Sequence, residues 1–157
     1  MENTHIIKKE KKNFAIITEL LRKAGSLTKT KLVKMLFLID LDYYNKKKKK
    51  LSNFTYIRYF YGPYPKEIET ILSYLNALGI ITYETRLSSA GKTYYLISIN
   101  TNDRVKKLGL QDSLNTEEKF IIEKIAKDYS TKNLDDILKQ VYELDEVKNK
   151  PFGETIL

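Results

Sequence analysis

The chain has 157 residues, which fits one domain, or a core of about 100 residues with a small appendage. Hydrophobic residues make up 42 % of it. No apolar run reaches the roughly 18 residues of a membrane span, and the charged stretch 1–12 is not a secretory signal. The absence of cysteine excludes a disulfide framework and a thiolate metal site, so we expect a cytoplasmic protein with no membrane insertion.

The formal charge of +8 is unevenly distributed. Residues 1–99 carry 18 Lys and Arg against 8 Asp and Glu, whereas residues 100–157 carry 10 against 12. A basic first part indicates nucleic acid or an acidic partner on one side of the molecule. The bases are 24 lysines and only 4 arginines, however, and Arg is the preferred residue for bidentate phosphate and guanine contacts. A solvated, lysine-rich surface is therefore the simpler interpretation.

The first predicted element is a helix from Lys8 to Ala24, with apolar residues recurring at spacings of three and four. Gly25 ends it in the usual position after a helix. A short connection then leads to a second helix, Thr28–Tyr44. Two helices joined by a short turn are typical of a helix-turn-helix and also of any small helical bundle.

The second predicted helix is apolar around most of its circumference, so other elements must pack around it. A helical wheel places Lys34 and Leu38 on its polar side, which predicts that Leu38 is an exposed apolar residue. Asp40 falls in the middle of the apolar arc. A buried carboxylate needs a partner, and the candidates are Arg58, a tyrosine hydroxyl or a backbone N–H group. We interpret Asp40 as a structural anchor.

Next comes a run of five lysines, Lys46–Lys50, which predicts an extended solvated loop or, alternatively, an unspecific phosphate contact. Thr55–Tyr61 is β-branched or aromatic apart from Arg58, which predicts a strand. Gly62-Pro63-Tyr64-Pro65 then predicts a rigid turn. An amphipathic helix follows and ends at Gly79.

The stretches Ile80–Arg86 and Thr93–Ile99 alternate as two strands of a β-hairpin. Helices followed by a hairpin are typical of a winged helix, although the hairpin could equally cover one side of the core. In the winged-helix interpretation the residues that would contact nucleic acid are Lys29, Lys31, Lys34, Arg86 and Lys92, the last two near the wing tip. Two further helices are predicted, one beginning at the capping-box-like Asn115–Glu118 and one over Leu134–Leu144.

The predicted fold class is α+β and mainly helical: a small bundle around the central helix at about 28–44, with one short strand and a winged-helix-like hairpin. Residues 1–100 would form the core with its hairpin, and residues 101–157 would add helices packed on it within one domain.

The sequence lacks the residues that most catalytic chemistry requires. His5 is the only histidine, and no glycine-rich phosphate loop is present. Asp40 and Asp42 point in roughly opposite directions on one helix, so they cannot act as a pair. We therefore expect no catalytic residue, no cofactor and no metal, and a protein that is not an enzyme.

One combination of motifs spans residues 31–79: Lys31-Leu32-x-Lys34-Met35-Leu36-Phe37-Leu38-x-Asp40, then Tyr61-Gly62-Pro63, then a helix ending in Leu78-Gly79. This combination resembles the Panacea domain, the SocA-like antitoxin family, including its YwgA-type relatives. It implies a non-enzymatic interaction domain that binds and neutralises a toxin directly. The Gly-Pro-Tyr-Pro turn is nearer to the YwgA-type form, and the five-lysine run is an insertion.

The leading hypothesis is an antitoxin-like module that binds a partner protein. The alternative is a winged-helix-like DNA-binding regulator, acting at its own promoter. Tyrosine is common at protein interfaces, so the candidate partner-binding residues include three tyrosines. The partner-binding candidates are Lys34, Leu38, Tyr59, Tyr61 and Tyr64, and the residues assigned a structural role are Asp40, Arg58, Gly62 and Pro63.

Overall fold

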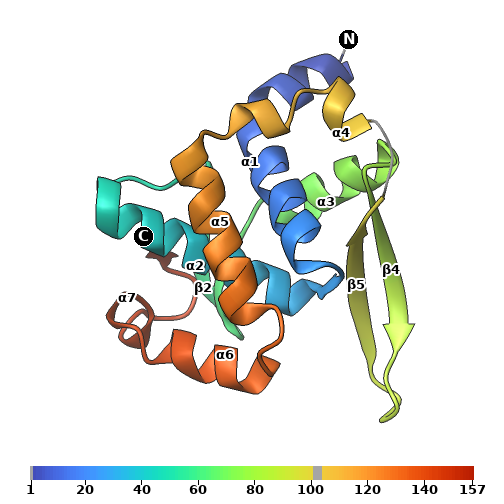
Figure 1. Cartoon of the computed structure of the whole chain (residues 1–157). Helices are drawn as coiled ribbons and strands as arrows, with labels where there is room; N and C mark the ends of the chain where they lie inside the picture. The colour runs from blue at the N-terminus through green and yellow to red at the C-terminus, as the bar shows by residue number, and fades with distance from the viewer. Residues whose placement is uncertain (1, 101–103) are drawn as a thin grey trace.

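The computed structural model describes residues 2–100 and 104–157, with side chains for residues 10–100 and 105–157. Helices and strands are interspersed along the chain, and the strands form two small antiparallel sheets (Figure 1). About half of the chain is helical. The α+β class is therefore as predicted. The elements are α1 (Glu2–Ala24), β1 (Leu27–Thr28), α2 (Lys29–Lys47), β2 (Tyr56–Tyr59), β3 (Gly62–Pro65), α3 (Ile68–Ala77), β4 (Ile81–Leu87), β5 (Thr93–Ile99), α4 (Arg104–Lys107), the 3-10 turn η1 (Gln111–Ser113), α5 (Thr116–Tyr129), α6 (Leu134–Tyr142), α7 (Asp145–Lys148) and β6 (Thr155–Ile156).

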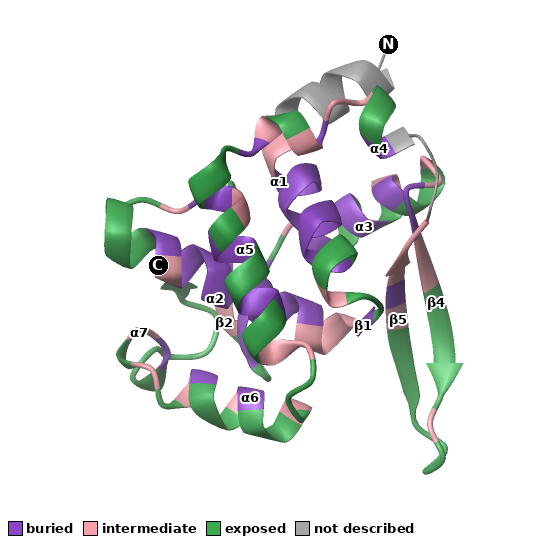
Figure 2. Cartoon of the chain, in the orientation of Figure 1, coloured by how far each residue is buried: buried purple, intermediate pink, exposed green. Residues whose placement is uncertain are grey.

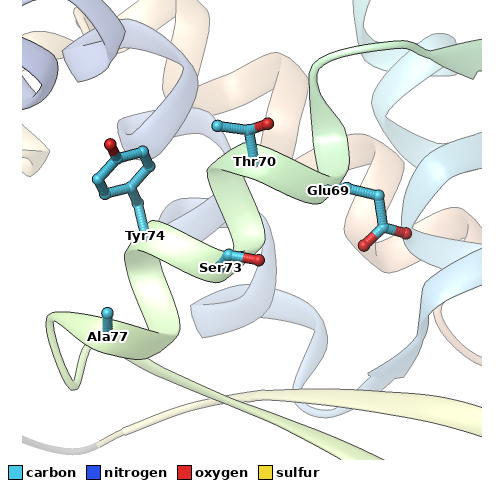
Figure 3. Close-up of a pocket in the computed structure, with 5 residues that line it drawn as sticks. All are labelled: Glu69, Thr70, Ser73, Tyr74 and Ala77. Carbon is cyan, nitrogen blue, oxygen red and sulfur yellow. The ribbon is translucent and has the colours of Figure 1, made fainter.

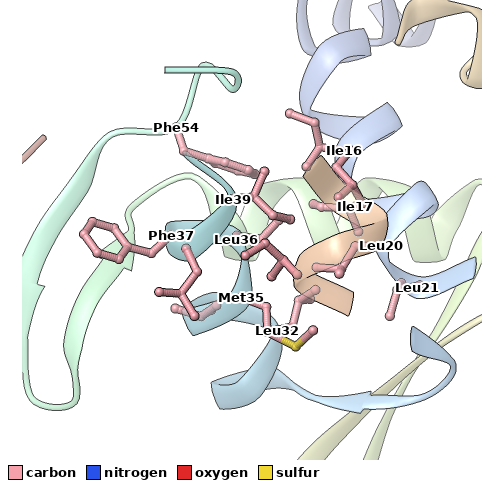
Figure 4. Packing of buried hydrophobic residues seen from close by; sticks show 14 of the residues in the cluster. Ile16, Ile17, Leu20, Leu21, Leu32, Met35, Leu36, Phe37, Ile39 and Phe54 are labelled. Carbon is pink, nitrogen blue, oxygen red and sulfur yellow. The ribbon is translucent and has the colours of Figure 1, made fainter. Parts of the chain in front are cut away.

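Helix α2 is the centre of the core, as predicted. Every residue from Leu32 to Leu41 is buried, so the helix has no solvent-facing side over three turns. The apolar stripe of α1 packs against α2 (Figure 4), and α5 contacts both helices. Thr28 caps the start of α2, because its side chain accepts a hydrogen bond from the backbone N–H of Lys31 at 3.3 Å.

The lysine run differs from its prediction as a loop, because α2 continues to Lys47. Lys46 and Lys47 occupy the last turn, where positive charge is favourable for the helix dipole. Lys48 then ends the helix in the left-handed conformation, with φ of 61°. The run therefore extends and terminates a helix.

The first sheet has the strand order β1-β5-β4. The predicted hairpin is confirmed, with Ile81 opposite Ile99 and Leu87 opposite Thr93. The short strand β1, in the α1–α2 connection, pairs with β5 through Leu27 and Ile97. The far half of the hairpin projects from the helices and is exposed (Figure 2).

The second sheet has the strand order β3-β2-β6. Residues 62–65, predicted as a turn, form strand β3, and the turn lies one step earlier, at Phe60 and Tyr61. Gly62 has φ of +95°, a backbone conformation that residues other than glycine rarely adopt. Strand β6 pairs with β2, which brings residues 151–156 beside the β2–β3 turn.

The C-terminal helices pack on the α1–α2 core. Asn115 and Glu118 form the predicted capping box at the start of α5, with two reciprocal hydrogen bonds of 2.8 Å. Residues 134–144, predicted as one helix, form α6 only as far as Tyr142. Among the described residues, none of the helices is both long enough and apolar enough to cross a membrane.

Candidate functional site

Asp40 is the centre of a buried polar network. Its Oδ1 accepts a hydrogen bond from the backbone N–H of Ser52 at 2.8 Å, and its Oδ2 accepts two more, from the hydroxyls of Ser52 and Tyr56, each at 2.5 Å. The expectation of a buried, partnered carboxylate is confirmed, with an exposed fraction of 1 %. A tyrosine hydroxyl and a backbone N–H are the partners, so Arg58 was the wrong candidate.

This network fixes the segment before β2 to the central helix. Burial raises the pKa of Asp40, while the three hydrogen bonds act in the opposite direction. The pKa of Tyr56 is raised well above its usual value by burial and by the adjacent carboxylate. The Tyr56 ring also packs edge-on against Phe37, with ring centroids 5.2 Å apart. All three side chains of the network are buried, so it offers no solvent-accessible group.

Lys34 and Leu38 are buried, contrary to the prediction that they lie on an open polar stripe. Their exposed fractions are 2 % and 6 %. Strand β3 and helix α6, both distant in sequence, cover this side of α2. The Lys34 Nζ donates a hydrogen bond to the carbonyl oxygen of Pro63 at 2.8 Å. Lys34 and Leu38 therefore cannot meet a partner on this surface, and Lys34 cannot meet a DNA phosphate.

Lys34 and Arg58 lie close enough at the β2–β3 hairpin for their charges to interact. Burial, and after it the positive charge of Arg58, lowers the pKa of Lys34 to about 7. The Arg58 guanidinium lies over the ring of Tyr142, 4.9 Å from its centroid, and donates to the carbonyl oxygen of Tyr59. Among the described side chains, neither cation has a carboxylate within ion-pair distance.

Four aromatic side chains gather at the end of the β2–β3 hairpin, and we call them the hairpin-tip cluster: Tyr59, Phe60, Tyr64 and Phe152. Tyr59 is its centre, with ring centroids 4.8 Å from Phe60, 5.4 Å from Tyr64 and 5.4 Å from Phe152. Phe60 and Phe152 also lie 5.0 Å apart. Phe60 is 68 % exposed and Phe152 is 60 % exposed, so the cluster is an apolar patch open to solvent.

The structure thus brings together two of the predicted candidates, Tyr59 and Tyr64, and places Tyr61 beside them in the turn, 62 % exposed. Phe60 and Phe152 were missed. The signal for Phe60 was present, because it stands between Tyr59 and Tyr61 in the same aromatic run, directly before the Gly62-Pro63 step. Phe152 joins the cluster only through the pairing of β6 with β2, where the Gly153 N–H donates to the Arg58 carbonyl at 2.6 Å.

A second group of side chains continues from Tyr64 toward the β4–β5 hairpin. Lys29 forms an ion pair with Glu69, and its Nζ lies 5.6 Å from the ring centroids of both Tyr64 and Tyr95. Tyr83 stacks on Tyr95 at 5.3 Å and donates to Glu69 at 3.3 Å. Burial lowers the pKa of Lys29. This cation is engaged within the fold, contrary to its candidate role as a free phosphate contact.

The remaining candidates for nucleic acid are scattered. Lys31 donates to the carbonyl oxygen of Ser130, and Arg86 forms an ion pair with Glu84 at 2.6 Å. Lys92 is exposed. Helix α3 carries a shallow open depression of about 400 Å³, shown in Figure 3. The residues that line it include one acid and no base: Glu69, Thr70, Ser73, Tyr74 and Ala77.

Comparison with known proteins identifies the family. The model of the family described as "Antitoxin SocA-like, Panacea domain" matches residues 32–146. The chain belongs to the SocA-like antitoxin family. The predicted resemblance is thereby confirmed, and it extends through most of the chain. A search of curated proteins and a search of solved structures each found no match.

The match to the SocA-like family begins in α2 and ends in α7. It includes the buried Asp40 and Lys34 and three members of the hairpin-tip cluster, while Phe152 lies beyond it. Membership points to a protein partner and to a non-enzymatic role. Among the described residues, no group of three or more His, Cys, Asp or Glu side chains could hold a metal ion.

Proposed function

We propose that this chain is an antitoxin-like module that binds a toxin protein in the cytoplasm and neutralises it through the hairpin-tip cluster. The observation that carries the proposal is the exposed, contiguous aromatic surface of Tyr59, Phe60 and Phe152 on a member of an antitoxin family. Tyr61, next to Phe60 in the turn, is also exposed. Neutralisation then requires binding alone, with no chemical step.

The position of these rings supports an interface. Tight turns usually carry Gly, Asn, Asp, Ser or Pro, whereas this one carries Phe60 and Tyr61. Exposed aromatic residues contribute large apolar areas to protein–protein contacts and are enriched where binding energy concentrates.

The hairpin-tip cluster is also held in place before any partner arrives. The Tyr142 hydroxyl donates to the Phe60 carbonyl at 2.8 Å, and the Gly153 N–H donates to the Arg58 carbonyl. The ring contacts add to these bonds. A pre-ordered surface loses little conformational entropy on binding, which favours affinity.

We further propose that the first hundred residues form a winged-helix-like unit. What supports this is the order α1, β1, α2, β2, β3, α3, β4, β5, in which β2 and β3 belong to the other sheet, together with the strand order β1-β5-β4. In this interpretation α3 corresponds to the helix that would enter a DNA groove, and the β4–β5 hairpin corresponds to the wing.

DNA binding is the second candidate function, and only the order of the helices and strands favours it. The charge on α3 argues against it, because Ile68–Ala77 contains Glu69 and neither lysine nor arginine. Phosphate contacts supply most of the affinity for DNA and make it strongly dependent on salt. A mobility-shift titration of a 30-base-pair duplex from the chain's own promoter at rising salt separates the two candidates. Binding that weakens steeply with salt would support a DNA-binding role.

The antitoxin proposal is tested by co-expression with the product of the adjacent gene. We expect that induction of the adjacent product alone arrests growth and that the wild-type chain restores it. The double variant Phe60→Ser, Phe152→Ser should fail to restore growth. Phe120→Ser is the matched control, since Phe120 is a 63 % exposed phenylalanine on α5 with no ring contact to the cluster. Equal rescue by all three chains would refute the proposed surface.

A further inference from the structure

We propose that the partner of the hairpin-tip cluster is an acidic segment, in which a carboxylate binds the Arg58 guanidinium while a neighbouring apolar side chain packs on Phe60 and Phe152. This inference rests on the proposed function, because it specifies the chemistry of the protein that the same surface binds.

Arg58 differs from the other arginines whose side chains the structure describes. Arg22 pairs with Glu19 at 2.9 Å, and Arg86 pairs with Glu84 at 2.6 Å. Arg58 has no such partner among the described side chains, although it immediately precedes Tyr59 in the cluster. An arginine that the chain leaves unpaired next to an apolar patch is available for a charge brought by a partner.

The geometry of Arg58 suits a carboxylate. The guanidinium lies over the Tyr142 ring, 4.9 Å from its centroid, and one N–H group donates to the carbonyl oxygen of Tyr59, so two contacts restrict its position. A guanidinium has five N–H donors in a rigid fork that matches both oxygens of a carboxylate. Because the side chain is half-buried and already ordered, forming this pair requires little loss of side-chain entropy.

No described side chain supplies a carboxylate to Arg58. Lys34 lies beneath the same hairpin, but it is buried and its pKa is lowered to about 7, so it adds little positive charge at the surface. A carboxylate from a partner would therefore be stabilised by the Arg58 guanidinium itself. The nearest acid along the strand pairing is Glu154, whose backbone carbonyl accepts from the Arg58 N–H at 2.7 Å. Its side chain is exposed and has no ion pair among the described residues, so it leaves the guanidinium open.

The aromatic neighbours favour a protein carboxylate over a nucleic-acid phosphate. Arginine and aromatic side chains together are characteristic of the centre of protein–protein interfaces. The phosphate alternative would require further cations around Arg58, and the nearby Lys34 is buried. The expected binding sequence has an Asp or Glu within two residues of a Phe, Tyr, Trp, Leu or Ile.

A phage-displayed library of random 12-residue peptides, selected on the immobilised full chain, tests this expectation. Peptides recovered on the wild type and on Phe120→Ser should be enriched in such acidic–apolar pairs relative to the starting library. Peptides selected on Arg58→Gln should keep the enrichment in apolar residues and lose the enrichment in acidic residues. Peptides selected on the double variant Phe60→Ser, Phe152→Ser should lose both enrichments.

Two further measurements keep the result decisive. The best-enriched peptide, measured by fluorescence anisotropy, should bind Arg58→Gln at least about tenfold more weakly than the wild type. Arg58→Gln also removes the stacking on Tyr142, so Arg58→Lys is the second variant. Because it keeps the charge without the fork, we expect an intermediate affinity. Melting curves establish that each variant is folded.

The outcomes separate the two proposals. Apolar enrichment that depends on Phe60 and Phe152 but has no acidic component would overturn the carboxylate inference and leave the proposed surface intact. Selection that is unaffected by the phenylalanine substitutions would overturn both. A 20-base-pair duplex that binds as tightly as the best peptide, and weakens with Arg58→Gln, would reassign Arg58 to phosphate and also overturn the inference.

Discussion

Lys34 in α2 and Pro63 in β3, 29 residues apart, are joined by a hydrogen bond of 2.8 Å from Nζ to the carbonyl oxygen. This bond ties the central helix to the hairpin that presents the aromatic cluster. Proline cannot donate a backbone hydrogen bond, so the contact of Pro63 with α2 goes through its carbonyl oxygen. A buried lysine at this position therefore couples the core to the candidate binding surface.

The stability of the protein should rise with pH between 7 and 10.5 because of Lys34. Its pKa is about 7 in the folded state against 10.5 as a reference, so the unfolded chain binds more protons in this window. Burying the charged form of Lys34 lowers the free energy of unfolding by the full amount below pH 7, where the lysine is charged in both states. This cost, about 5 kcal/mol at its largest, vanishes above pH 10.5, where the lysine is neutral in both states. Lys34→Met removes this titration while retaining a flexible apolar side chain.

Urea unfolding of the wild type and of Lys34→Met at pH 6, 8 and 10 measures this effect. The free energy of unfolding of the wild type should rise relative to that of the variant as the pH rises. Any weakening of the bond to Pro63 when Lys34 loses its proton is already part of the Lys34 titration. Parallel pH profiles for the two proteins would show that Lys34 keeps an ordinary pKa.

Substitutions at Asp40 should differ sharply in cost. In Asp40→Asn the amide can still accept from the Ser52 N–H, and the hydroxyls of Ser52 and Tyr56 can rotate to accept from it. Asp40→Leu leaves three buried donors without an acceptor. We expect a loss of about 1 kcal/mol for Asn and of more than about 3 kcal/mol for Leu. Equal losses in urea unfolding would argue against the network.

Gly62→Ala should destabilise the β2–β3 hairpin through backbone strain alone. A Cβ at this position would lie 3.7 Å from Val141 and 3.8 Å from Tyr142, which is ordinary contact, so space is available. The φ of +95° is the obstacle, and we expect a cost of about 1–2 kcal/mol in thermal unfolding. An unchanged melting temperature would mean that the hairpin relaxes to another conformation.

The sequence predicted those features that depend on local periodicity. The helices and the β4–β5 hairpin follow from patterns of three to four and of two residues, and the wheel placed Asp40 inside correctly. The same wheel failed for Lys34 and Leu38. It assumes that the polar side of a helix faces water, but β3 and α6 cover that side. A local sequence pattern cannot predict that elements distant in the chain will bury one side of a helix.

The candidate surface was predictable in part. Tyr59, Tyr61 and Tyr64 were candidates because tyrosine is common at protein interfaces. Phe152 enters the surface only because a two-residue strand, β6, pairs with β2. Strands this short have no pattern of their own and form only where a neighbouring strand offers hydrogen bonds. The family match ends at residue 146, so it does not reach Phe152 either.

The most direct test of the hairpin-tip cluster is the dissociation constant of the complex with the adjacent gene product, measured by calorimetry for three purified chains. Phe60→Ser, Phe152→Ser should bind at least about a hundredfold more weakly than the wild type, because two exposed aromatic anchors are lost. Phe120→Ser, equally exposed elsewhere, should bind like the wild type. Unchanged affinity of the double variant would contradict the assignment of this surface to partner binding.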